Sequence, residues 1–114
     1  MGDLMRSSTR FWKVGDLEPP IREGLVDGDG EIIDLANCTV EFLYRPVDTT
    51  GQLVTSDADI VDADSGIVEF VPLITDTAVA GTYEYWWVVT DAGGDPRTIP
   101  QDGANMFIVE EAPS

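Results

Sequence analysis

The chain has 114 residues, 43% of them hydrophobic, with 22 acidic against 6 basic residues and a formal net charge of −16. This length and apolar content predict one folded domain and argue against a disordered acidic tail. The negative charge argues against nucleic-acid binding, which needs a cationic face, and no apolar run reaches the ~20 residues of a membrane span. We therefore expect a soluble protein, folded in a cytoplasm, with neither a nucleic acid nor a membrane as partner.

Residues 1–10 are predicted to form a basic arm. Residues 1–13 hold three of the 6 basic residues but only one of the 22 acidic ones. Such an arm can dock onto an acidic neighbour, including a second copy of the chain, or it can be a terminus that touches nothing. The contact residues predicted here are Arg6, Arg10, Phe11, Trp12 and Lys13.

Short β-rich runs separated by turn clusters follow the arm, a pattern typical of an all-β sandwich or barrel. The expected strands span residues 10–15, 21–27, 31–35, 39–45, 67–71, 83–90, 97–100 and 105–111, with one or two more in 52–62. This spacing is typical of immunoglobulin-like domains. We predict an antiparallel immunoglobulin-like β-sandwich of about seven to nine strands over residues 11–112.

Three local features refine this prediction. Residues 39–45 alternate, which places Val40, Phe42 and Tyr44 on one face of a strand. Gly66 sits between two strand runs, where a hairpin turn uses positive φ. The segment 75–81 is too short for a stable helix and is expected to form a single helical turn.

The stretch TDTAVAGTYEYWWVV, residues 75–89, predicts a tyrosine corner. In antibody domains the corner tyrosine precedes the second bridging cysteine by two residues. Tyr83 fits the corner, but Tyr85 stands where the cysteine would be, and Cys38 is the only cysteine of the chain, so an intrachain disulfide is excluded. The expected core residues of this strand are Tyr83, Tyr85, Trp87 and Val89.

The opposite face of the same strand carries Trp86 and Val88 between polar residues. Exposed tryptophan is enriched in binding hot spots, so we hypothesise that these two side chains lie at an intersubunit contact. The alternative is that a neighbouring loop or the N-terminal arm covers Trp86.

Catalysis is not expected. The chain contains no histidine, which excludes Ser-His-Asp, Cys-His and zinc-histidine sites. Cys38 is expected to be a small buried apolar residue.

No cofactor is expected either, although three acidic clusters, 27–34, 57–66 and 91–96, invite a calcium interpretation. The twelfth position of an EF-hand loop would fall on Cys38 or Leu73, neither of which can bind calcium. The same letters are common in tight turns, and loop-bound calcium stays open as an alternative.

One longer pattern resembles a known family. It combines Trp12, Val14, Gly15, Asp16, Pro19, Pro20, Ile21, Leu25, Asp27, Asp29, Gly30, Asp34 and Leu35. Together with VDADSGIVEFVP, AGTYEYWW and TIPQDGANMFIVEE, it resembles the immunoglobulin-like N-terminal domain of phage baseplate upper proteins, also found in minor tail proteins of siphophages. The resemblance covers about residues 11–111.

This resemblance implies a non-enzymatic structural subunit of a tailed-phage virion, present in several symmetric copies and assembled in the host cytoplasm. In the family the module is the attachment end of a longer chain. Here it is almost the whole sequence, so attachment carries over and receptor binding does not. A tail-tip or baseplate position is expected first and a capsid decoration protein second. The alternative from another class is a carbohydrate-binding module in which Trp86 and neighbouring tyrosines stack on sugar rings.

Overall fold

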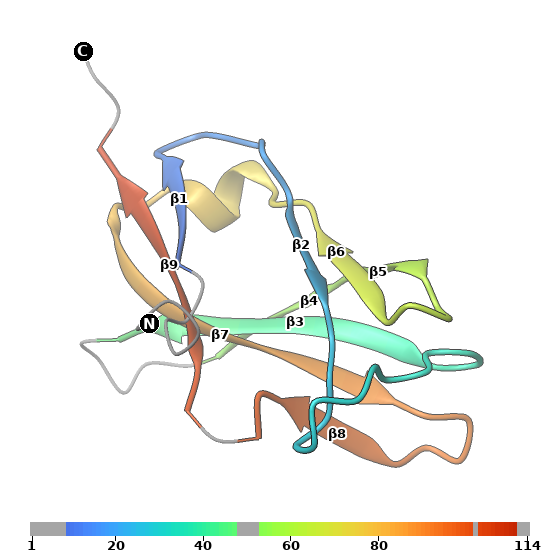
Figure 1. Cartoon of the computed structure of the whole chain (residues 1–114). Helices are drawn as coiled ribbons and strands as arrows, with labels where there is room; N and C mark the ends of the chain where they lie inside the picture. Colours follow the sequence, from blue (N-terminus) through green and yellow to red (C-terminus); the bar gives the residue numbers. More distant parts are fainter. Residues whose placement is uncertain (1–8, 48–52, 102, 112–114) are drawn as a thin grey trace.

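The computed structural model describes residues 9–47, 53–101 and 103–111, and these residues form an all-β sandwich (Figure 1). The strands are β1 (Thr9–Lys13), β2 (Ile21–Gly24), β3 (Thr39–Pro46), β4 (Val54–Asp57), β5 (Asp59–Asp62), β6 (Ile67–Phe70), β7 (Gly81–Thr90), β8 (Pro96–Ile99) and β9 (Asn105–Glu110). A single turn of 3₁₀ helix, η2 (Ile74–Thr77), connects β6 to β7.

The strands form two sheets that pack face to face. Sheet A has the order β1-β9-β7-β3-β4, with β8 also paired to β7, and sheet B has the order β2-β6-β5. All pairs are antiparallel except β1 with β9, which is parallel. Strands β9-β7-β3 facing β2-β6-β5 reproduce the arrangement of the two sheets in immunoglobulin-type sandwiches. The predicted sandwich is confirmed.

Aromatic side chains from both sheets fill the space between them. Phe42 of sheet A stacks on Phe70 of sheet B with ring centroids 3.9 Å apart, and both rings are buried. The predicted inward sets of β3 and β7 are confirmed as buried: Val40, Phe42, Tyr44, Tyr83, Tyr85, Trp87 and Val89. Strand alternation alone explains this pattern, because every second side chain faces the other sheet.

The tyrosine corner is also confirmed. The hydroxyl of Tyr83 donates a hydrogen bond to the carbonyl oxygen of Val79 at 2.7 Å. The single helical turn expected here is η2, which ends four residues before β7 begins. Its buried Asp76 accepts hydrogen bonds from the Tyr44 hydroxyl at 2.6 Å and the Leu73 N–H at 2.7 Å. These bonds fix the connection between the sheets.

Two segments differ from the sequence prediction. Residues 31–35 form no strand, only a bridge between Val26 and Ile32, because the turn at 27–31 folds the chain back onto the two residues that follow β2. Strand β1 begins at Thr9, so the last two residues of the predicted arm belong to the sandwich. At Gly66 the predicted positive φ is confirmed at 67°, and an added Cβ would lie 2.8 Å from the carbonyl oxygen of Ile33.

Candidate interaction surfaces

The prediction that Trp12 anchors the chain on a neighbour is wrong. The Trp12 side chain is only 2% exposed, and its indole N–H donates to the carbonyl oxygen of Pro19 at 2.7 Å. Its ring meets that of Phe107 edge-on, with centroids 5.0 Å apart. Because β1 is a strand, alternation turns Trp12 into the core while Phe11 and Lys13 face outward.

The basic residues of β1 pair with acidic groups of the same chain. The Arg10 guanidinium lies 3.4 Å from a carboxylate oxygen of Glu23, and the Lys13 ammonium 2.6 Å from one of Glu110. Neither charge is therefore free to attract a neighbour without first losing its intrachain partner. Phe11 is 55% exposed and remains available for contact. Arg6 lies outside the described residues.

Trp86 and Val88 lie on the outer face of sheet A and are half-buried. The Trp86 indole N–H donates to the carbonyl oxygen of Gly103 at 2.9 Å, and the guanidinium of Arg45 sits 5.4 Å from the ring centroid. A loop residue and a cation thus cover part of the indole. The surface that these two residues can offer to a partner is smaller than an uncovered tryptophan would provide.

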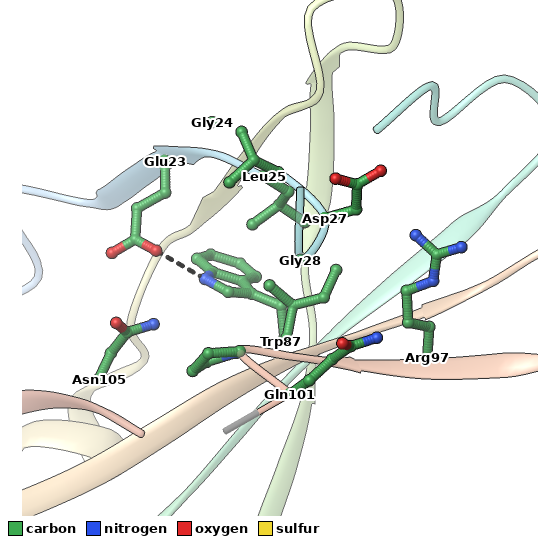
Figure 2. Close-up of a pocket in the computed structure, with 12 residues that line it drawn as sticks. Glu23, Gly24, Leu25, Asp27, Gly28, Trp87, Arg97, Gln101 and Asn105 are labelled. Atoms are coloured by element: carbon green, nitrogen blue, oxygen red, sulfur yellow. Dashed lines mark hydrogen bonds between the residues drawn. The ribbon is translucent and has the colours of Figure 1, made fainter. Parts of the chain in front are cut away.

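A polar cluster around Glu23 joins the two sheets at the mouth of a hollow of about 380 Å³ (Figure 2). The Glu23 carboxylate accepts hydrogen bonds from the Trp87 indole N–H at 2.9 Å and from the Tyr85 hydroxyl. Glu23 belongs to β2 of sheet B, and its two partners belong to β7 of sheet A. These strands correspond to the two that the disulfide joins in antibody domains. A hydrogen-bonded carboxylate therefore links the sheets where a disulfide would.

Two buried tyrosines are held in their neutral form. Burial, followed by the negative charge of Glu23, raises the pKa of Tyr85 far above its ordinary value. Burial and the hydrogen bond to Asp76 raise the pKa of Tyr44 in the same direction. Both phenols therefore act as hydrogen-bond donors to a carboxylate throughout the neutral pH range.

Glu23 is a residue that the sequence prediction missed. Its signal was present, because Ile21, Glu23 and Leu25 alternate on the face of the strand that points into the core. An acidic residue within such a series indicates a buried partner. The Glu23 carboxylate already has Tyr85, Trp87 and Arg10 as partners, so it serves the structure and is not a free base for chemistry.

The acidic loops form two turns of the same kind. One carboxylate oxygen of Asp27 accepts hydrogen bonds from the N–H groups of Asp29 and Glu31, at 2.9 and 3.0 Å. One oxygen of Asp91 does the same for Gly93 and Asp95, at 2.9 and 3.0 Å. Side-chain capping of a turn explains why aspartate recurs at these positions. In the described part of the chain no three acidic or cysteine side chains come together as a metal site.

The aromatic side chains leave little platform for a sugar ring. The three tyrosines, Tyr44, Tyr83 and Tyr85, are all at most 8% exposed. The carbohydrate-binding alternative predicted that tyrosines near Trp86 stack on sugar rings. That part of the prediction is wrong, because the tyrosines pack in the core. Trp86 keeps part of its ring accessible, but Arg45 lies over it, and the exposed Phe11 stands on β1, two strands away from β7 in sheet A.

Comparison with known proteins finds a similar fold among solved structures but no similar sequence. No family model matches the chain, and no curated protein sequence does. Among solved structures, the chain is similar to the "N-terminal domain of phage TP901-1 ORF48", with a TM-score of 0.66 and 16% sequence identity. The likeness covers 91% of this chain and 86% of the other. At this identity the likeness establishes a shared sandwich fold.

In the described residues no helix is long and apolar enough to span a membrane.

Proposed function

We propose that this protein is a non-enzymatic structural subunit of a tailed-phage virion, placed at the tail tip or baseplate in several copies. The observation that carries the proposal is the likeness of nearly the whole sandwich to a phage domain. The residue pattern that resembles baseplate upper proteins agrees with it, while no family model matches the chain. Its partners would be other virion proteins and copies of itself, and it would be assembled in the host cytoplasm.

The chemistry of the described residues is compatible with a role in assembly. The chain has no histidine, and the carboxylates of Glu23 and Asp76 are engaged in hydrogen bonds within the sandwich. The net charge of −16 keeps free copies apart by repulsion before assembly and disfavours contact with nucleic acid. A subunit of this kind acts by presenting a rigid surface and needs no reactive pocket.

Quantitative mass spectrometry of purified virions tests the proposal. We expect the protein in purified particles at a few to a few dozen copies, as for a tail component. Hundreds of copies per particle would place it on the capsid as a decoration protein. Its absence from particles, with the protein present in infected cells, would contradict a virion role.

A glycan array separates the structural role from carbohydrate binding. We expect no sugar to bind above background. Specific binding that Trp86→Ala abolishes would favour the carbohydrate-binding alternative.

A further inference from the structure

An apolar surface lies at the end of the sandwich where β6 connects to β7, beside the turn after β1. Five large aliphatic side chains there are 47 to 67% exposed. We call this the apolar end surface, and its residues are Leu17, Val71, Leu73, Ile74 and Val79. Contiguous exposed apolar side chains on a small protein mark a binding surface more often than scattered ones do.

Hydrogen bonds hold the two parts of this surface together. The Gly15 N–H donates to the carbonyl oxygen of Thr77 at 2.9 Å, and the Thr77 hydroxyl donates to the carbonyl oxygen of Asp16 at 2.9 Å. Figure 1 shows η2 beside the end of β1. Two further hydrogen bonds hold the connection between β6 and β7: Tyr83 donates to the carbonyl oxygen of Val79, and Tyr44 donates to the buried carboxylate of Asp76. The apolar side chains are thus presented on an ordered frame.

Four of the five side chains of the apolar end surface come from residues 71–83, and this segment exposes no charged side chain. Residues 71–83 contain one ionisable acid, Asp76, which is 7% exposed and has both carboxylate oxygens hydrogen-bonded. The segment 71–83 therefore offers exposed apolar side chains with no exposed charged side chain among them.

The rim of this surface is acidic. The Val14 N–H donates to the carbonyl oxygen of Glu110 at 2.8 Å, which places the end of β9 beside the β1–β2 turn. Four acidic side chains stand near this junction against one cation, which is already paired with one of them. These residues are Asp16, Glu18, Glu110, Glu111 and Lys13.

We propose that the apolar end surface docks onto a different virion protein whose facing area is apolar and bordered by lysine or arginine. This inference rests on the proposed function and names the contact through which it works. The acidic rim selects a basic border by charge complementarity. A second copy of this chain fits less well, because its own rim is acidic and each copy carries a net charge of −16.

A complementation experiment tests this contact. A phage lacking the gene is grown in cells that produce the wild type or Ile74→Ser/Val79→Ser, and copies per virion are counted by mass spectrometry. The control is Val54→Ser/Val61→Ser, which makes the same chemical change at exposed valines of β4 and β5. We expect the end-surface variant to lose incorporation by about tenfold or more, and the control to match the wild type. Circular dichroism and thermal unfolding of each purified protein confirm that it folds.

A second variant tests the charge of the rim. Glu18→Lys/Glu111→Lys should lower incorporation, because it places lysines against the basic border that we propose. An increase would overturn the basic border and with it the proposed partner.

The outcomes separate the two proposals. If the wild type is absent from particles, the virion role itself fails. If the wild type and Ile74→Ser/Val79→Ser incorporate equally, the virion role stands and the docking surface is wrong. Sedimentation of the purified wild type at low and high salt covers the homotypic case: dimers that the end-surface variant cannot form would overturn the heterologous contact.

Discussion

The two faces of β7 each carry a tryptophan, but the two tryptophans have different surroundings and different roles. The inner face, Tyr83, Tyr85, Trp87 and Val89, is buried. Tyr85 and Trp87 donate hydrogen bonds to Glu23 of sheet B, and Tyr83 donates one to Val79 in the connection before β7. The outer face is half-buried, and its Trp86 bonds to a loop carbonyl and has one arginine over its ring. Two adjacent tryptophans in one strand can therefore have different roles: the buried Trp87 stabilises the core, and the half-buried Trp86 forms part of the surface.

Replacing each tryptophan in turn would test this contrast most strongly. Trp87→Ala removes a fully buried ring and should lower the free energy of unfolding by about 3–5 kcal/mol. Trp86→Ala removes a half-buried ring with one hydrogen bond and one cation contact, and should cost about 1–2 kcal/mol. Urea denaturation measures both. Equal losses would show that the two faces do not differ as described.

The Glu23 cluster gives the next largest effect. Glu23→Ala leaves the buried donors of Tyr85 and Trp87 without their acceptor, which should cost about 2–4 kcal/mol. The matched control is Glu69→Ala on the neighbouring strand β6, whose carboxylate pairs with the exposed Arg22 and should contribute about 1 kcal/mol or less. Thermal and urea unfolding measure both variants. A Glu23→Ala protein as stable as the control would mean that the cluster does not hold the sheets together.

High pH should destabilise the folded protein through two buried tyrosines, Tyr44 of β3 and Tyr85 of β7. Tyrosine in the unfolded chain ionises near pH 10, whereas the raised pKa values of Tyr44 and Tyr85 keep them protonated in the folded protein. The unfolded state therefore binds fewer protons above pH 10, and stability falls as the pH rises further, by up to about 1.4 kcal/mol per pH unit for each tyrosine. Tyrosinate absorbance during an alkaline titration reports the ionisation. Early ionisation of every tyrosine without unfolding would contradict the buried hydrogen bonds.

Local rules were sufficient to predict the inner face from the sequence. Alternation gave the buried sets of β3 and β7, and the corner position gave the bond from Tyr83 to Val79. The positive φ of Gly66, 67°, was predictable because the residue sits in a turn between two strand runs. Each of these features depends on a few consecutive residues and on the geometry of a strand or turn.

The surface was harder to predict, because it depends on residues distant in sequence. Trp12 was assigned to a docking arm from the charge of its neighbours, although alternation through β1 places it in the core. The alternation around Glu23 indicates a buried partner, but the identity of that partner depends on β7, more than 60 residues away. Ile74 and Val79 are exposed because η2 lies at the end of the sandwich, and no local sequence pattern predicts that position.

A cryo-electron microscopy reconstruction of the purified virion at side-chain resolution tests most directly how this sandwich acts. We expect the domain in the tail, with Leu73, Ile74 and Val79 buried against a different protein and lysine or arginine facing Glu18. A virion in which the domain is present but this end faces solvent, with another surface making the contacts, would contradict the assignment.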